Sequence, residues 1–416
     1  MDDLRRIGYS DKVFQYKPSR NLRIRVVLKK PLELELLKDA VSKALDDFEE
    51  YKVAPVKKGK DIFYKKNDRE VAFFPDDDKE RFFGSDEVNG YLFHILYGKS
   101  SFMLSLFHGL TDFKGMWAFL SDIIFRYARN AGYDVPDIRI NDEPLSSEDR
   151  SDPYSLYADK DAEIILPEYS GNTLYIPAPD RYPEDLRVQH EYTLTVSVSK
   201  FLKMTREWKS SASCALAAII SNTLADLYDA GDRDVLLKIT CDMRAVFGSC
   251  SKVNMSEAFL LVSDKELRKE PLEKHCAVLT DMMRSQFNKE NFSKYMACSI
   301  DDVMVRAGEK EKADIISPRP KLTYVLTYPG RMDLPEEYNE LVSDFELKGY
   351  FPIDAVRFTI KSTGDELRIG IDQVFDGDEI IRAIADSFVK LGFETTVRDE
   401  GRFGGDNYSL DLIREM

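Results

Sequence analysis

The stretch SFMLSLFHGLTDFKGMWAFL, residues 101–120, predicts a strand, a sharp corner and a helix in direct succession. Apolar residues alternate up to Leu106 with the period of two that is typical of a strand. From Gly115 onward, the apolar residues instead recur at helical spacing. His108 ends the predicted strand, and Asp112 lies four residues later, where a helix N-cap is expected.

A bare His-x-x-x-Asp pattern has two interpretations. It arises often by chance, and the histidine then simply ends a strand while the aspartate caps the next helix. A strand-to-helix corner also lies at a sheet end, where side chains can face a cleft. The pKa of histidine suits removal of a proton near neutral pH, once its tautomer is fixed. His108 and Asp112 are therefore candidate catalytic residues, and Gly115 is a structural candidate that allows close packing of the helix start.

The composition limits the class of protein. The chain has 416 residues, of which 43% are hydrophobic, enough for the cores of two domains. A formal net charge of −15 argues against nucleic-acid binding, which needs a basic face, and against adhesion to anionic lipid. No apolar stretch approaches the ~20 residues that span a bilayer, and no signal-peptide pattern begins the sequence. We expect a cytoplasmic protein with neither a nucleic-acid nor a membrane partner.

Several common kinds of site are not indicated. The five cysteines are odd in number and form no C-x-x-C pair, so neither a zinc site nor a disulfide framework is expected. The serine hydrolase, phosphate-loop, zincin and dinucleotide-binding signatures are absent from the sequence. We therefore expect no metal and no permanently bound cofactor.

Strands and helices alternate along most of the chain, which predicts an α/β (α+β) protein. Residues 22–30 predict a strand, residues 31–51 an amphipathic helix, and residues 90–109 a hairpin that leads to the corner. Between residues 134 and 187 the periodicity fades, and Pro, Asp, Glu and Ser become frequent. A structureless segment of this length is unusual inside one compact domain, so a domain boundary is expected there.

Both halves of the chain contain strands packed by a few long helices, so we expect two related units. The expected division gives an N-terminal domain at residues 1–165, a linker at residues 166–187 and a C-terminal domain at residues 188–416.

The corner also resembles a known motif. FHGLTDFKG, residues 107–115, is similar to the H-H-x-x-x-D-G motif of the chloramphenicol acetyltransferase-like superfamily, most closely in its bacterial alcohol-acetyltransferase-like branch. This superfamily includes coenzyme-A-dependent acyltransferases and the condensation domains of peptide synthetases. The resemblance puts His108 on the catalytic base and Asp112 on the structural aspartate. Phe107 stands in place of the first histidine, and Phe113 in place of the motif glycine.

The resemblance covers most of the chain. Residues 22–49 are similar to the opening strand and helix of the superfamily, and residues 322–338 to a later strand and its Leu-Pro loop. Residues 239–262 are similar to a second-domain segment with an arginine and an asparagine, here Arg244 and Asn254. The implied fold has two chloramphenicol acetyltransferase-like domains, each a mixed sheet with flanking helices, and an active-site tunnel between them.

The function implied by the resemblance is acyl transfer from acyl-coenzyme A, as co-substrate, to a hydroxyl or amine of a small acceptor. His108 would take the acceptor proton while Asp112 keeps the corner in shape, and no covalent acyl-enzyme would form. Arg244 is interpreted as a structural ion-pair partner. The candidates for binding substrate and stabilising the oxyanion are Asn254, Ser256, Thr327 and Tyr328.

Two alternatives remain open. A condensation-type enzyme of the same fold would take its acyl group from an acyl carrier protein. The charge of −15 favours free coenzyme A as the donor, because carrier proteins are commonly acidic. A non-catalytic relative is the other alternative, although the presence of both His108 and Asp112 argues against it.

The other polar features of the sequence have simpler interpretations. His94 is expected to be a packed or edge residue of its strand, and His190 and His275 are expected at the surface. The run EKEKADIISPRPK, residues 309–321, could meet the phosphates of coenzyme A, but a solvated loop is the preferred interpretation.

Overall fold

A computed structural model gives the positions of most residues. The residues that it describes are 4–9, 12, 21–59, 61–77, 79–139, 145–146, 148–159, 171–176, 188–306, 322–350 and 356–415.

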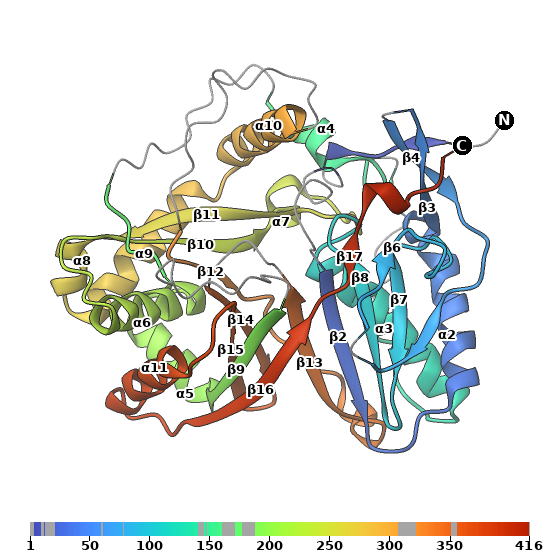
Figure 1. Cartoon of the computed structure of the whole chain (residues 1–416). Coiled ribbons are helices and arrows are strands. Elements are labelled where there is room, and N and C mark those ends of the chain that lie inside the picture. The colour runs from blue at the N-terminus through green and yellow to red at the C-terminus, as the bar shows by residue number, and fades with distance from the viewer. Residues whose placement is uncertain are drawn as a thin grey trace.

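The strand before the corner lies in a five-stranded sheet of the order β13-β2-β8-β7-β5. The bounds of these strands are β13 (Val342–Tyr350), β2 (Asn21–Leu28), β8 (Ser101–Phe107), β7 (Phe93–Tyr97) and β5 (Phe73–Pro75). The predicted hairpin is confirmed, because β7 and β8 pair antiparallel. Alternate residues of β2 and β8, such as Ile24 and Leu104, are fully buried in one core with α2 (Leu34–Asp47) and α3 (Phe113–Asn130) (Figure 1).

A second, seven-stranded sheet has the order β11-β10-β12-β14-β15-β9-β16. The bounds of its strands are β11 (Ser256–Ser263), β10 (Val235–Asp242), β12 (Tyr324–Thr327), β14 (Val356–Thr363), β15 (Glu366–Gln373), β9 (Val188–Ser197) and β16 (Thr396–Gly404). Strands β10, β12 and β14 run parallel, and the other pairs are antiparallel, so the sheet is mixed, as expected. Its core is shared with helices α5 (Val198–Glu207), α6 (Ala212–Leu227), α9 (Leu272–Gln286) and α11 (Glu379–Lys390).

The remaining elements are short or lie at the periphery. A three-stranded sheet contains β1 (Arg5–Arg6), β4 (Asp61–Lys66) and β3 (Val53–Lys58), and a two-stranded one contains β17 (Asn407–Tyr408) and β6 (Phe82–Phe83). The other helices are α4 (Pro153–Tyr157), α7 (Arg244–Phe247), α8 (Lys265–Lys269) and α10 (Lys289–Arg306).

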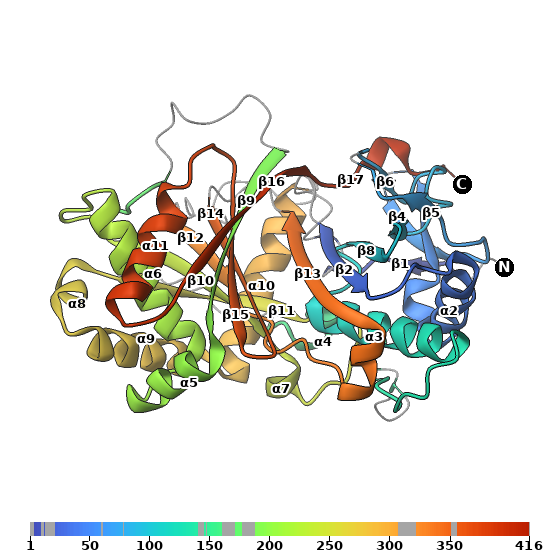
Figure 2. The ribbon, with the colours of Figure 1, turned by 90° about the horizontal axis from the view of Figure 1, so that it is seen from below.

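Two strands from the C-terminal half of the chain join the N-terminal unit, as Figure 2 shows. Strand β13 pairs antiparallel with β2, and β17 pairs parallel with β6. The C-terminal region expected at residues 188–416 therefore supplies strands to both units and is not a separate body. The expected linker at residues 166–187 lies outside the described residues except for residues 171–176, so the division at residue 165 stays a prediction.

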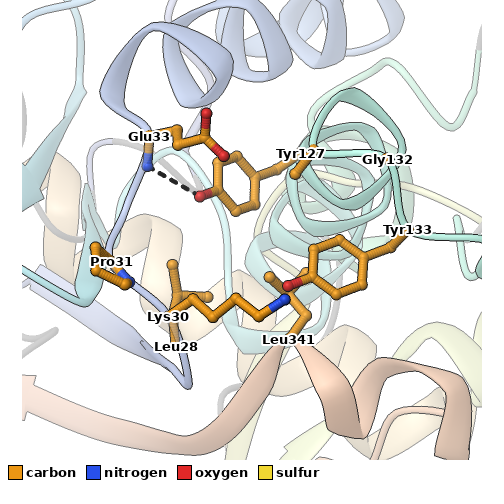
Figure 3. A pocket seen from close by; sticks show the side chains of 9 residues that line it. Leu28, Lys30, Pro31, Glu33, Tyr127, Gly132, Tyr133 and Leu341 are labelled. Carbon is orange, nitrogen blue, oxygen red and sulfur yellow. Dashed lines mark hydrogen bonds between the residues drawn. The ribbon is translucent and has the colours of Figure 1, made fainter.

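A pocket of about 220 Å³ opens at the end of the first unit that lies away from the corner (Figure 3). It lies where β2 and α3 end, between Leu28, Lys30, Tyr127 and Tyr133. The opposite end of β2 pairs with Phe107, next to His108, so this pocket belongs to another part of the molecule. Within the described part of the chain, no helix combines the length and the apolar character that crossing a membrane requires.

Candidate active site

The corner forms as the sequence predicts. Strand β8 ends at Phe107, and α3 begins at Phe113. Asp112 has the extended backbone of an N-cap residue, and its carboxylate accepts a hydrogen bond of 3.1 Å from the Gly115 N–H. His108 lies in the turn between strand and helix, and its side chain is partly buried. The simple capping interpretation of Asp112 is therefore confirmed, but this carboxylate has further partners.

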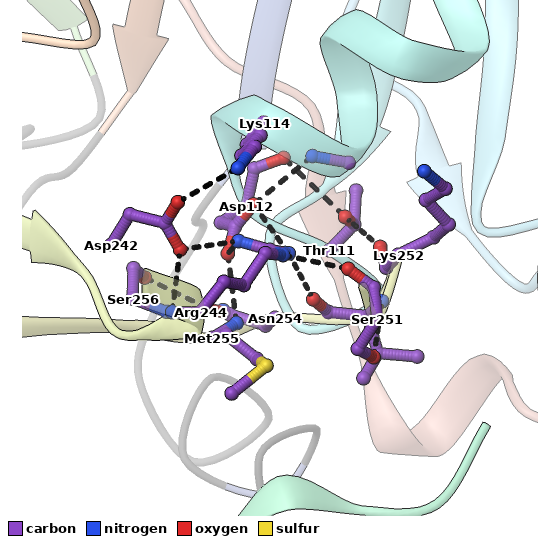
Figure 4. A network of polar contacts seen from close by, with 12 residues as sticks. Thr111, Asp112, Lys114, Asp242, Arg244, Ser251, Lys252, Asn254, Met255 and Ser256 are labelled. Carbon is purple, nitrogen blue, oxygen red and sulfur yellow. Dashed lines mark hydrogen bonds and ion pairs between the residues drawn. The ribbon is translucent and has the colours of Figure 1, made fainter. Parts of the chain in front are cut away.

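The second unit supplies those partners (Figure 4). Arg244, at the start of α7, donates to Asp112 with both terminal nitrogens, at 2.8 and 3.1 Å. The backbone N–H of Met255 donates to the same carboxylate at 2.8 Å. Both side chains of the pair are buried, with residues Asp112 and Arg244 only 4% and 3% exposed. Burial alone would raise the pKa of Asp112, but the Arg244 guanidinium and the two backbone donors hold this pKa below its usual value.

The Arg244 side chain is held in place by further hydrogen bonds within the second unit. Its Nε donates to the Ser251 carbonyl at 2.6 Å, and a terminal nitrogen donates to the Val253 carbonyl at 2.7 Å. Asp242 accepts a further hydrogen bond of 2.9 Å from the guanidinium. A guanidinium with this many planar contacts orders the loop at residues 248–255 around it. The predicted ion-pair partner thus connects the corner of one unit to a loop of the other.

The tautomer of His108 follows from its contacts. Its Nδ1 lies 3.0 Å from the Thr111 carbonyl oxygen, which can only accept a hydrogen bond. Asn254 Nδ2 lies 3.2 Å from the same Nδ1 and donates to the His108 carbonyl oxygen at the shorter distance of 2.9 Å. Nδ1 therefore carries the hydrogen, and Nε2 carries the basic lone pair.

Asn254 is oriented by its own neighbour. Its Oδ1 accepts hydrogen bonds from the Ser256 N–H at 3.0 Å and from the Ser256 hydroxyl at 2.7 Å. These bonds distinguish the amide oxygen from the amide nitrogen, so Nδ2 faces His108. The structure thus brings His108, Asp112, Arg244, Asn254 and Ser256 together at one place.

The two units also meet closely at the start of α3. The Lys252 carbonyl accepts a hydrogen bond of 2.9 Å from the Tyr51 hydroxyl and another from the Thr111 hydroxyl. A Cβ on Gly115 would lie 2.2 Å from this carbonyl oxygen and 2.0 Å from Thr111 Oγ1. Only glycine fits at this position without displacing the backbone of the second unit.

Thr327 and Tyr328 lie elsewhere on the second unit, at the end of β12. The Tyr328 hydroxyl donates to Ser362 at 3.4 Å, and its ring packs against the second core. Among the described residues, no hydrogen bond joins either side chain to His108. The residues that the sequence interpretation missed are Thr111, Asp242 and Lys252. Of these, only Thr111 lies inside the motif, and its contact with His108 is made by the backbone carbonyl, which every residue type has.

The other histidines lie in different surroundings. His94 is fully buried, so it is packed as expected, and burial lowers its pKa to about 4. His275 is also fully buried, so its predicted surface position was wrong; the turns of α9 place it against the core. The His190 side chain is 15% exposed and lies between Asp376 and Asp399, so it is more enclosed than predicted. The run at residues 309–321 lies outside the described residues.

No metal centre is visible in the described part of the chain, where no group of three His, Cys, Asp or Glu side chains could hold an ion.

Neither a protein-family model nor a curated protein sequence matches the chain. Solved structures do match it. TRI101 of F. sporotrichioides, solved with coenzyme A and T-2, has a TM-score of 0.64 at 12% identity, covering 95% of this chain and 100% of its own. The epimerization domain from the third module of tyrocidine synthetase B has a TM-score of 0.63 at 12% identity, covering 94% and 97%. The condensation domain of the Monacolin K polyketide synthase MokA has a TM-score of 0.61 at 12% identity, covering 93% and 96%.

At these identities the likeness concerns the fold. It extends over nearly the full length of this chain and of each matched chain. The resemblance noted at residues 107–115 is thereby confirmed for the fold of the whole chain. The chain has the two-domain chloramphenicol acetyltransferase-like fold that the TRI101, epimerization-domain and condensation-domain structures share.

Proposed function

We propose that the protein is an acyltransferase that moves an acyl group from acyl-coenzyme A to a hydroxyl or amine of a small acceptor. The observation that carries this proposal is the hydrogen bond between His108 Nδ1 and the Thr111 carbonyl, which leaves the basic lone pair on Nε2. The shared fold, and the coenzyme A bound in the matched TRI101 structure, support the donor class.

In the proposed reaction His108 is the general base. Nε2 accepts the acceptor proton while the acceptor oxygen or nitrogen forms a bond to the thioester carbon. The carbonyl electrons move to oxygen, and their return breaks the carbon–sulfur bond. The sulfur leaves as a thiolate, which takes the proton back from Nε2. A positioned base of this kind contributes roughly 10²–10⁴-fold to the rate.

Asp112 and Arg244 have a structural role in this proposal. Their ion pair holds the corner against the second unit, and the contacts of His108 Nδ1 are instead with the Thr111 carbonyl and Asn254, so we assign neither group a part in proton transfer. Asn254 orients His108 through the 2.9 Å hydrogen bond to its carbonyl oxygen, and Ser256 in turn orients Asn254. Asn254 Nδ2 also lies 3.2 Å from His108 Nδ1, so Asn254 remains a proposed substrate contact.

Thr327 and Tyr328 are the remaining proposed substrate contacts. They lie at the end of β12, which is parallel to β10, the strand that leads to Arg244. The ends of parallel strands meet at one edge of a sheet, so substrate bound between the units would face both strands. We propose that these residues stabilise the oxyanion or bind the acceptor.

A carrier-bound thioester is the second candidate donor, because two of the matched structures are domains of peptide and polyketide synthases. The net charge of −15 still favours a small donor over an acidic carrier protein. We propose that the protein works in the reducing cytoplasm, where its five cysteines would stay reduced.

The test is a thiol-release assay. The protein is incubated with acetyl-, medium- and long-chain acyl-coenzyme A and a panel of alcohols and amines, and free thiol and acylated product are followed together. His108→Gln is the matched control, because glutamine has a similar size but cannot act as a base at neutral pH. Product formation by the wild-type protein alone supports the proposal. Turnover only with the carrier-bound form of the same acyl group would favour the condensation-type alternative, and no turnover with either donor would contradict acyl transfer.

A further inference from the structure

The C-terminal segment Asp406–Tyr408, here called the strap, returns from the second unit to the first. Strand β16 pairs with β9 at the edge of the seven-stranded sheet, and the chain then crosses over so that β17 pairs with β6 (Figures 1 and 2). The backbone N–H of Asn407 donates to the Arg81 carbonyl at 2.8 Å, which continues this pairing. The strap therefore ends beside the sheet that carries His108.

Asp406 anchors the strap inside the first unit. It is fully buried, and its carboxylate forms an ion pair with Arg23 at 2.9 Å. The same carboxylate accepts hydrogen bonds from the Ser105 hydroxyl and, at 3.2 Å, from the Arg81 N–H, and His94 Nε2 lies 3.3 Å from it. Arg23 also donates to the Gly404 carbonyl at 3.0 Å, so both sides of the crossing are tied to β2. A carboxylate with this many partners fixes where the following residues lie.

Tyr408 is the residue that this anchor presents to the corner. Its ring stacks on Phe107 with the ring centroids 4.7 Å apart and the planes tilted by 17°. Phe107 is fully buried, and its ring lies directly beneath the turn, because a Cβ on Gly109 would be 2.3 Å from Phe107 Cε1. His108 is the residue between Phe107 and Gly109, so the stacked rings form the floor of the turn that carries it.

We propose that Tyr408 is a positioning residue for His108, held in register by Asp406 and acting through Phe107. This inference rests on the proposed role of His108 as the general base. Loss of the Tyr408 ring would open space on one side of Phe107, so its ring could shift and the turn could relax. His108 Nδ1 would then lose its fixed distance to the Thr111 carbonyl, and the imidazole would no longer keep one tautomer. Displacements of about 1 Å in such groups cost up to ~100-fold in rate.

The test compares three variants. Tyr408→Ala removes the ring, Tyr408→Phe keeps the ring and removes only the hydroxyl, and Leu412→Ala changes an exposed residue that follows the strap in the sequence. In steady-state assays, Tyr408→Ala should lower kcat by about tenfold or more with little change in KM, whereas Tyr408→Phe and Leu412→Ala should stay near the wild-type values.

A second measurement is independent of activity. The chain has only four histidines, so the imidazole nitrogens of His108 can be followed by ¹⁵N NMR and assigned with His108→Gln. The wild-type protein and Tyr408→Phe should show a protonated Nδ1 and an unprotonated Nε2. In Tyr408→Ala, exchange between the two tautomers should average the ¹⁵N chemical shifts of Nδ1 and Nε2.

The outcomes separate this inference from the proposed function. Absence of acyl transfer by the wild-type protein would contradict the proposed function, and the NMR comparison would then decide the positioning role alone. A wild-type kcat and an unchanged His108 spectrum in Tyr408→Ala would overturn the inference, even if the melting temperature fell. Equal losses of kcat in Tyr408→Ala and Tyr408→Phe would also overturn the inference, because the stacked ring would then not be what positions His108.

Discussion

Asp112→Ala should cost the protein several kcal/mol of stability as well as its activity. The carboxylate accepts hydrogen bonds from two Arg244 nitrogens and from the backbone N–H groups of Met255 and Gly115. Its removal leaves the buried Arg244 with Asp242 as its remaining carboxylate partner. Breaking a buried ion pair from one side costs about 3–5 kcal/mol. Loss of the helix cap costs about 1 kcal/mol. The two losses involve the same atoms, so the larger one is the expected total.

Urea unfolding of a double-mutant cycle measures this contribution. The cycle consists of Asp112→Ala, Arg244→Met and the double variant, and each protein is followed by circular dichroism and by tryptophan fluorescence so that separate unfolding of the two units is detected. The double variant should lose less stability than the sum of the two single losses, because it leaves no buried charge without its partner. Additive losses, or a wild-type midpoint and full activity in Asp112→Ala, would refute the structural role of the pair.

The dependence on pH gives a second check. The pKa of Asp112 is lowered in the folded protein, so its stabilising contribution is present above the unfolded pKa, about 3.9, and is lost as the pH falls through the folded pKa. Asp112→Asn keeps a side-chain acceptor for the cap but removes the charge. The difference in unfolding free energy between wild type and Asp112→Asn should therefore be constant from pH 7 to pH 5 and should decrease only at more acidic pH. A difference in unfolding free energy that already falls to zero near pH 6 would contradict the lowered pKa of Asp112.

Four further outcomes are expected. His108→Ala should leave the melting temperature and the circular dichroism spectrum unchanged while reducing acyl transfer below a tenth of wild type; a higher residual rate in a folded variant would remove His108 from the mechanism. Gly115→Ala should lower both stability and activity, because its Cβ would collide with the Lys252 carbonyl, and normal behaviour would show that the units need not approach so closely there. Burial lowers the pKa of His275 to about 4, so the folded protein loses stability as the pH falls from about 6.5, and His275→Leu should show a smaller fall in melting temperature between pH 7 and pH 5. Limited proteolysis should cut first between residues 134 and 187, whereas a first cut within either sheet would count against the predicted boundary.

Local patterns predicted the corner well. The change from a period of two to helical spacing locates the end of β8 and the start of α3, because both periods are properties of neighbouring residues. Asp112 was recognisable as a cap for the same reason. Arg244 and Asn254 were found through the resemblance alone, since no spacing within one sequence relates residue 112 to residue 244.

The connections between the units could not be predicted in this way. Strand β16 (Thr396–Gly404) is largely polar on both faces, so it lacks the alternation that predicts a strand. It forms a strand because it pairs with β9 at the edge of the seven-stranded sheet. The position of β13 beside β2 depends on a partner more than 300 residues away, as the pairing of Tyr350 with Asn21 illustrates. The burial of His275 was missed because the charged residues beside it in sequence lie on other faces of α9.

The departure of the corner from the superfamily motif, Phe113 in place of glycine, has a geometric explanation in the first turn of α3. Successive residues of a helix are rotated by about 100°, so residues 113 and 115 face different sides. Phe113 points toward the first unit and stacks on Trp117, one turn further along, with the ring planes 9° apart and the centroids at 6.3 Å. Gly115 instead faces the second unit, where a Cβ would reach the Lys252 carbonyl, and its N–H is the group that Asp112 caps. The requirement for a residue without a side chain therefore falls three positions after the aspartate in this protein, and the large ring at position 113 does not disturb the contact between the units.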